Sequence, residues 1–358
     1  MNFTDFSKEE IERASRYHRP RYTLLFVRTA LTVCVVLALR LAIGHDLDGA
    51  GWAGAAALWA VLVVVALDLV TLPLDLWHGY VRERRWGFST QTLGGWVADH
   101  VKGLAISIVL AVGAWTAVVA IGRAWPSWWV VPAAVGAALV VLFLLFLAPV
   151  VLEPIFNSFR PLEDTGLAQR LTALAERVGA PVKTVLVSDA SRRTNKVNAY
   201  VSGLGTSRRV VVWDTLLEAA DADGVALVVA HELGHRKLRH VAKLTAAAMV
   251  AAVAVVVVLR LVLSTPHGSD LPVAWLLVLA SEVVLLPLLS ALSRRFEREA
   301  DLFALRATGE LTTFERVMTT LARRNLGDLA PPRWAYLLMF SHPTAPERLA
   351  LARARAGA

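Results

Sequence analysis

The chain has 358 residues, of which 56% are hydrophobic and 18% are charged, and its mean hydropathy is +0.54. A soluble globular protein carries about 25% charged residues, so this composition excludes an ordinary soluble domain and favours a membrane protein. The formal net charge is +8, but no stretch interleaves basic with aromatic residues as nucleic-acid-binding surfaces do, so no nucleic-acid partner is expected.

Six apolar runs are long enough, or nearly so, to cross the roughly 30 Å hydrocarbon core of a lipid bilayer. They lie near residues 23–43, 52–72, 101–122, 127–150, 241–265 and 272–292. A charged stretch precedes the first run and no small-residue cleavage site follows it, so this run is not expected to be a cleaved signal peptide. The one cysteine, Cys34, lies in that run, which excludes an intramolecular disulfide and a cysteine metal cluster.

The distribution of Lys and Arg predicts how these spans are oriented. Basic residues are frequent in 1–22, 73–100, 153–240 and 293–358, whereas the connections 44–51 and 266–271 contain none. Cytoplasmic loops carry the excess of Lys and Arg in membrane proteins. Both termini and the large hydrophilic regions are therefore expected on the cytosolic side of the cell membrane. Two ionisable residues within the runs, Asp68 and Glu282, are expected either to face a cavity or to be paired structural charges.

Residues 153–240 are predicted to form a small α/β region. Residues 165–178 have helical periodicity, and the short β-branched runs 182–187 and 210–212 are typical of strands. Between these runs, residues 198–205 alternate polar with apolar residues and end at glycines. This pattern predicts an edge strand followed by a turn.

Residues 231–235 read His-Glu-Leu-Gly-His and lie just before the fifth span. Residues i and i+4 share one face of a helix, so His231 and His235 can bind one Zn²⁺ while Glu232 acts as base on a metal-bound water. The motif fixes only three positions and also arises by chance. The apolar stretch 224–230 before it is typical of a buried helix, where unpaired imidazoles and carboxylates are costly, so we interpret the motif as a site for one zinc ion.

The third ligand is expected from a separate segment of the chain. Leu238 and Val241 stand where a metzincin would have Gly and His, which excludes that class. Glu297 and Asp301 follow the sixth span at i and i+4 and share a helix face, so one can bind zinc while the other orients a ligating histidine. The alternative is a solvated charged face. The fifth and sixth spans are joined by a short turn, so they should be antiparallel neighbours. His235 and Glu297 should therefore lie at about the same distance from the hydrocarbon core of the membrane.

Six groups of residues carry a resemblance to a known family. They are 85–89 with Asp99 and Lys102, 153–157 with 161–164, 198–200 through 214–217, 231–235, 296–301, and 341–343 with Arg348. Together they resemble the CAAX prenyl protease 1 family, also called a-factor-converting enzymes, which are integral-membrane zinc metalloendopeptidases. They occur in family order from about residue 73 to 350, so the resemblance extends over most of the chain.

This resemblance implies a role for each of nine residues. His231, His235 and Glu297 would be the zinc ligands, Glu232 the catalytic base, Asn198, Ala199 and Tyr200 the strand that binds substrate, and His342 and Arg348 the residues near the scissile carbonyl. With Glu297 as the ligand, the spacing leaves Asp301 as the residue that orients a ligating histidine.

The expected fold is a mainly α multi-pass membrane protein of about six transmembrane helices with a zincin-like α/β catalytic region on the cytosolic face. It would comprise a cytosolic segment 1–22, four spans in 23–152 with a cytosolic loop at 73–100, a catalytic region 153–240 and two spans in 241–292. A cytosolic C-terminal part, 293–358, would supply the third zinc ligand and the Ser-His-Pro segment.

The expected function is that of a membrane-embedded zinc metalloendopeptidase that hydrolyses peptide bonds by a zinc-activated water. Its partners would be the lipid bilayer and a peptide or protein substrate, with or without a lipid group. Two alternatives stay open: a quality-control protease for damaged membrane proteins, and a non-catalytic transporter or membrane scaffold with a vestigial metal site. The intact Glu232 and the matching Glu297 disfavour the last.

Overall fold

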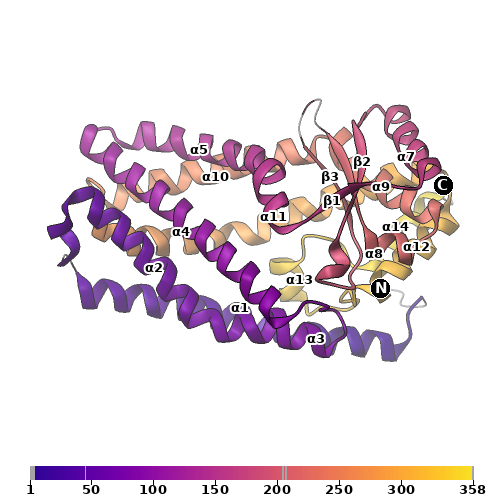
Figure 1. The fold of residues 1–358 in the computed structure, drawn as a ribbon, viewed down its shortest axis with the longest axis horizontal. Coiled ribbons are helices and arrows are strands. Elements are labelled where there is room, and N and C mark those ends of the chain that lie inside the picture. Colours follow the sequence, from indigo (N-terminus) through magenta and orange to yellow (C-terminus); the bar gives the residue numbers. More distant parts are fainter. Residues whose placement is uncertain (1–4, 45, 204, 206–207, 357–358) are drawn as a thin grey trace.

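Six long helices and a four-stranded sheet build the protein, which is described as a computed structural model for residues 5–44, 46–203, 205 and 208–356 (Figure 1). Each long helix contains a segment apolar enough to cross a membrane, which confirms the predicted number of spans. These helices are α1 (Lys8–Ile43), α2 (Gly51–Leu76), α4 (Leu93–Ala124), α5 (Val130–Leu147), α10 (His240–Val262) and α11 (Leu271–Thr308).

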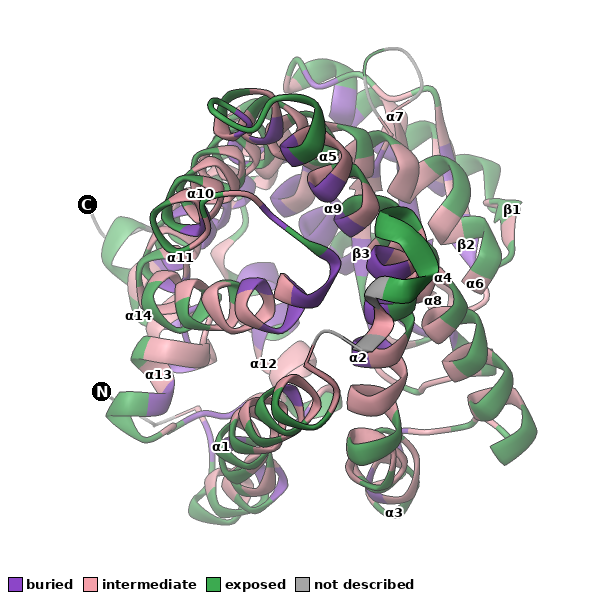
Figure 2. Cartoon of the chain, turned by 90° about the vertical axis from the view of Figure 1, so that its left-hand side faces the viewer, coloured by how far each residue is buried: buried purple, intermediate pink, exposed green. Residues whose placement is uncertain are grey.

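Viewed along their axes, the six helices stand in a ring (Figure 2). The order of neighbours is α1, α2, α4, α5, α10 and α11, and α11 packs against α1 to close the ring. The end of α2 continues through a π-helical turn, Trp77–Arg82, into the short α3 (Glu83–Arg85). The end of α5 continues in the same way through Ala148–Leu152 into α6 (Glu153–Phe156).

The helices extend well beyond the apolar runs that predict them. α1 begins at Lys8, where Ser7 and Glu10 form a capping box in which each side chain accepts a hydrogen bond from the other residue's backbone N–H. From Lys8 onward, the expected hydrophilic segment 1–22 is therefore part of the first helix. Only residues 86–92 of the expected loop 73–100 lie outside helices. Polarity marks where a helix leaves the hydrocarbon, whereas caps and turns decide where it ends.

The four-stranded sheet lies at one end of the helix ring (Figure 1). Its strand order is β1-β2-β4-β3, with β2 parallel to β4 and the other pairs antiparallel; the strands are β1 (Phe159–Pro161), β2 (Thr184–Ser188), β3 (Ala199–Ser202) and β4 (Arg209–Trp213). The predicted strands correspond to β2 and β4, and the predicted edge strand is β3. Sequence reasoning missed β1, because three residues that include Arg160 and Pro161 show no alternation.

Short helices pack around the sheet and enclose its core. They are α7 (Thr165–Arg177), α8 (Asp214–Ala219), α9 (Ala222–Lys237), α12 (Leu311–Arg324), α13 (Arg333–Met339) and α14 (Ala345–Ala356). The apolar stretch before the His-Glu-Leu-Gly-His motif is the buried part of α9, and it packs with Val210 and Val212 of β4 and Phe314 of α12. The motif therefore sits on a helix that the core holds on all sides.

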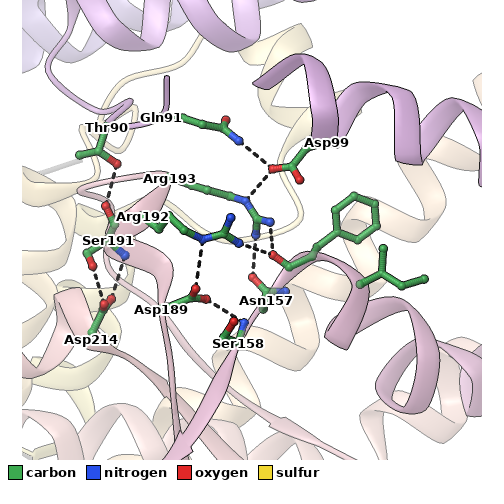
Figure 3. Close-up of polar contacts among 12 residues, drawn as sticks. Thr90, Gln91, Asp99, Asn157, Ser158, Asp189, Ser191, Arg192, Arg193 and Asp214 are labelled. Atoms are coloured by element: carbon green, nitrogen blue, oxygen red, sulfur yellow. Dashed lines mark hydrogen bonds and ion pairs between the residues drawn. The ribbon is translucent and has the colours of Figure 1, made fainter. Parts of the chain in front are cut away.

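Arg193 joins the sheet to the membrane helices (Figure 3). Its guanidinium donates to Asp99 of α4 at 2.9 Å, to the side chain of Asn157 at 2.9 Å and to the carbonyl of Phe156. Ser191 lies, like Arg193, in the connection between β2 and β3. Asp214, at the start of α8, accepts hydrogen bonds from the backbone N–H and the hydroxyl of Ser191. Residues from three of the segments that carry the family resemblance, among them Asp99, Asn157 and Asp214, thus meet in this network of hydrogen bonds.

Candidate metal centre

The His-Glu-Leu-Gly-His motif occupies the last two turns of α9. Asp221 caps the start of this helix by accepting a hydrogen bond from Gly224 N at 2.8 Å. The helix ends before Arg239, whose positive φ of 58° turns the chain sharply into α10. α9 packs against α11, so the two histidines face the helix that carries Glu297 and Asp301.

Ligand atoms of three residues converge between α9 and α11. His231 Nε2 lies 3.1 Å from His235 Nε2 and 3.2 Å from Glu297 Oε2, and His235 Nε2 lies 3.2 Å from Glu297 Oε1. Donor atoms about 2.0–2.1 Å from a tetrahedral zinc ion are about 3.3 Å apart, so the spacing of these atoms fits zinc. His231 and Glu297 are buried and His235 is half-buried. The residues present therefore suit a site with three protein ligands and one open position.

Asp301 lies directly behind His231. Its Oδ1 is 2.9 Å from His231 Nδ1, which directs the Nε2 of His231 toward the other ligands. Arg348 in turn donates from Nε to Asp301 Oδ2 at 2.8 Å and holds this carboxylate with a second hydrogen bond. Arg348 was expected near the scissile carbonyl; it does line the cleft, but its guanidinium is bound to Asp301.

The carboxylates around His231 and the burial of Glu232 change the pKa values of both residues. Burial alone would lower the pKa of His231, but Asp301 and Glu297 outweigh it and raise this pKa to about 10. Burial raises the pKa of the Glu232 carboxyl above its usual range. Glu232 is not in the ligand group, so its carboxylate is available to exchange a proton.

Two cavities, of about 420 Å³ and about 470 Å³, meet at the metal centre. The two cavities share five lining residues, which are Asn198, His231, Glu232, Glu297 and His342. The larger cavity runs along β3 past Tyr200 and Ser202, and the other extends toward His18 and Arg21 of α1. Together they form a cleft that is lined at its centre by Glu232 and by the metal ligands His231 and Glu297.

The edge of β3 that faces away from β4 presents backbone groups to this cleft. Trp213 N donates to Asn198 O at 3.1 Å, so the backbone groups of Asn198 point toward β4. In an antiparallel ladder the direction alternates from one residue to the next. The backbone groups of Val197, Ala199 and Val201 therefore point away from β4. Asn325 binds both the N–H and the carbonyl of Val197, at 2.9 and 3.0 Å, as a neighbouring strand would. Sequence reasoning missed Asn325, since a lone Asn after a helix carries no motif. The pairing edge therefore begins at Ala199, whose N–H donates to the side-chain oxygen of the adjacent Asn198 at 2.9 Å.

His342 reaches the centre from the loop between α13 and α14. Its Nε2 lies 3.3 Å from Glu297 Oε1, and its Nδ1 is 2.8 Å from the hydroxyl of Ser341. The buried Arg294 of α11 holds this loop by donating to the carbonyls of Tyr336 at 3.0 Å and Phe340 at 2.6 Å. Arg294 was also missed, because a single Arg just before the charged stretch 295–301 carries no motif.

The two ionisable residues within the spans differ in their surroundings. Asp68 of α2 lies 3.0 Å from His100 of α4, which gives its carboxylate a polar partner. Glu282 of α11 is exposed and has no polar partner among the described residues, so its expected place in a cavity wall stays a prediction.

Comparisons with known proteins agree with this arrangement. The model of peptidase family M48 matches residues 161–356, and the model described as the CAAX prenyl protease N-terminal region with five membrane helices matches residues 3–158. The uncharacterized metalloprotease YhfN of Bacillus subtilis is 31% identical over 300 residues, which are 78% of this chain and 69% of that protein.

Two further proteins are similar over most of the chain. A CAAX prenyl protease 1 homolog of Arabidopsis thaliana is 29% identical over 295 residues, which are 79% of this chain and 69% of that protein. The crystal structure of S. mikatae Ste24p aligns with a TM-score of 0.80 at 24% identity, covering 98% of this chain and 90% of that one. The last likeness confirms the fold, including the ring of long helices with a small mixed sheet at one end.

Proposed function

The chain belongs to peptidase family M48 as a multi-pass membrane metalloprotease related to CAAX prenyl proteases, and we propose that it is a zinc endopeptidase working at the cytosolic face of the membrane. One observation carries this proposal. His231, His235 and Glu297 offer ligand atoms within 4.8 Å of one another at the point where two cavities meet, and Glu232 lines both cavities without belonging to the ligand group.

His231, His235 and Glu297 would hold the zinc, with Asp301 and Arg348 keeping His231 in the required tautomer and orientation. When bound, the zinc supplies a Lewis acid that polarises the scissile carbonyl and lowers the pKa of a water molecule. Arg348 acts through Asp301 as a positioning residue. Because its guanidinium is bound to a carboxylate, we do not assign it a contact with the substrate.

Glu232 takes a proton from the attacking water and delivers it to the nitrogen of the leaving amine. A general base is most effective when its pKa is close to the working pH, and burial shifts the pKa of Glu232 in that direction. His342 donates a hydrogen bond from its imidazole N–H to the oxygen on which negative charge develops. The carboxylate of Glu297, 3.3 Å from Nε2, only accepts hydrogen bonds and therefore favours the tautomer that carries the proton on Nε2, and the hydroxyl of Ser341 can donate to Nδ1.

The substrate is a peptide or protein segment that binds in extended form along β3. Ala199 and Val201 direct backbone groups outward, so the segment can be added to the sheet as one more strand, with Asn198 and Tyr200 lining its path. Backbone pairing depends little on the substrate's side chains. This mode therefore suits both a processing enzyme and a quality-control protease for damaged membrane proteins.

Prenylated substrates are one class to test, since several relatives are named as CAAX prenyl protease 1 homologs. The experiment compares purified wild-type protein on peptides of the same sequence with and without a prenyl group, in detergent and in lipid vesicles. Cleavage of both peptides supports the zinc endopeptidase, and a higher kcat/KM for the prenylated peptide assigns the class. No cleavage of either peptide by zinc-loaded protein would contradict the proposal.

The cytosolic placement of the site rests on the distribution of basic residues. The α1–α2 connection and the segment 263–270 between α10 and α11 lie at the end of the helix ring opposite the sheet (Figure 1). In a Cys34→Ala background, cysteines at the exposed positions Ala50 and His267 should react with an impermeant thiol reagent in intact cells, and a cysteine at Glu9 should not. The reverse pattern would place the site on the outer face.

A further inference from the structure

His240 lies next to the metal centre. Its sequence context, a basic stretch after the His-Glu-Leu-Gly-His motif, predicts instead a residue where the helix emerges into water or lipid headgroups. It is the first residue of α10 and is only 1% exposed. Its ring stacks face to face on Phe296 of α11, with centroids 4.2 Å apart and planes 6° from parallel. The left-handed turn at Arg239 brings the chain back so that His240 faces the end of α9.

His240 connects His235 to a carboxylate. The Nδ1 atoms of His240 and His235 are 3.1 Å apart, and His240 Nε2 is 3.1 Å from Oε2 of Glu299 on α11. His235 uses its Nε2 in the ligand group, so its Nδ1 is the atom that remains for a partner. The structure thus places a His–Glu pair behind one ligating histidine, as it places Asp301 and Arg348 behind the other.

The protons in this chain of contacts can be assigned from the hydrogen bonds alone. An ionised carboxylate only accepts hydrogen bonds, so the proton of neutral His240 sits on Nε2, facing Glu299, and Nδ1 is left as an acceptor. His235 must then carry its proton on Nδ1 in order to donate to His240. This leaves the Nε2 of His235 unprotonated and directed at the same point as the ligand atoms of His231 and Glu297.

We propose that His240 and Glu299 form a positioning pair that fixes the tautomer and orientation of His235 for metal binding. The proposal rests on the zinc site of the proposed function and extends it to two residues outside the ligand group. Partners of this kind fix the ring of a ligating histidine and raise its basicity, and their loss typically lowers metal affinity by about 10–100-fold.

Four variants of the full-length protein separate this role from simple packing. His240→Ala removes both links. His240→Asn places an amide oxygen near the position of Nδ1, so it keeps an acceptor for His235 but cannot reach Glu299. Glu299→Gln keeps the size of the side chain and removes its charge. Arg295→Gln is the matched control, because Arg295 is 71% exposed and contacts the other oxygen of Glu299 at 2.9 Å.

The measurements are zinc affinity by competition with a chromophoric chelator, the visible absorption of cobalt-substituted protein, and thermal unfolding of metal-free protein. His240→Ala is expected to lower zinc affinity by about 10–100-fold and to change the cobalt spectrum. The zinc affinities of His240→Asn and Glu299→Gln should lie between those of His240→Ala and wild type. Arg295→Gln should have the zinc affinity and the cobalt spectrum of wild type. If His240→Ala matches wild type in affinity and spectrum, the proposal is wrong. Failure of the wild-type protein to bind zinc would instead overturn the proposed function.

A purely structural role for His240 gives a different result. The metal-free variants would then lose thermal stability, while the cobalt spectrum of the protein that remains folded would match that of wild type. That outcome also overturns the proposal.

Discussion

Gly234 of α9 lies so close to Phe303 of α11 that a β-carbon at position 234 would be 3.0 Å from the ring atom Cδ1 of Phe303. α9 carries His231 and His235, and α11 carries Glu297, so this contact lies between the two helices that hold the ligands. A glycine inside a helix costs stability relative to alanine. Here its lack of a side chain allows the two helices to approach.

Gly234→Val should therefore push α9 and α11 apart and weaken zinc binding. Overpacking of this kind costs about 1–3 kcal/mol of stability. Gly113→Val is the matched control, because a β-carbon at Gly113 in α4 would meet nothing within 4 Å. Zinc content and thermal unfolding are measured for both variants. Wild-type zinc affinity in Gly234→Val would show that this contact does not set the geometry of the centre.

The raised pKa of His231 predicts how the metal-free protein responds to pH. A group whose pKa is higher in the folded state contributes stability that is complete below its unfolded value of about 6.5. For His231 this contribution is lost as the pH rises through about 10. The proton also competes with the metal, so apparent zinc affinity should rise with pH, by up to about tenfold per unit for one released proton. Chelator-treated protein is followed by thermal unfolding and zinc titration from pH 6 to 10. A zinc affinity independent of pH would contradict this assignment.

Sequence spacing predicted the ligand group, because the i, i+4 pattern on a helix fixes which side chains share a face. The same reasoning predicted the six spans and the edge strand, since both depend on local periodicity. It missed His240, Asn325 and Arg294, which act through contacts between segments far apart in the chain. His240 lies only five residues after His235, but its partner Glu299 lies 59 residues further on and no periodicity links the two.

Helix ends were the other difference, and the partner of Arg348 was not predicted. Polar residues at 8–22 and 73–85 were assigned to hydrophilic segments, but a polar stretch with good caps continues a helix into water. Arg348 was expected near the scissile carbonyl by resemblance. Its bond to the buried Asp301 depends on the packing of α14 against α11, which no local sequence pattern predicts.

Substrate pairing with β3 predicts an alternating response to backbone methylation. In an antiparallel pair only every second residue exchanges hydrogen bonds with its partner, and on the outer edge of β3 these residues are Ala199 and Val201. A series of peptides, each with a single N-methyl group, should lose affinity at every second position near the scissile bond and tolerate methylation between them. KM values for the series report the pattern. A uniform response along the peptide would exclude binding as an added strand.

His342→Ala should keep bound zinc and nearly normal KM but lower kcat by about 10²–10³-fold, the usual cost of removing one donor to an oxyanion. The loop itself is held by Arg294, so its course should survive the substitution. Zinc content, thermal stability and peptide hydrolysis are compared with wild type. Loss of zinc or a large fall in stability would assign His342 to packing instead.

The most direct test of the central claim is turnover by Glu232→Gln protein with its metal content measured on the same sample. The variant keeps the three ligands, so it should carry about one zinc per chain, as wild type should. It lacks the carboxylate that takes the proton, so peptide hydrolysis should fall to the background rate. Zinc-loaded Glu232→Gln that hydrolyses peptides at the wild-type rate would contradict the account.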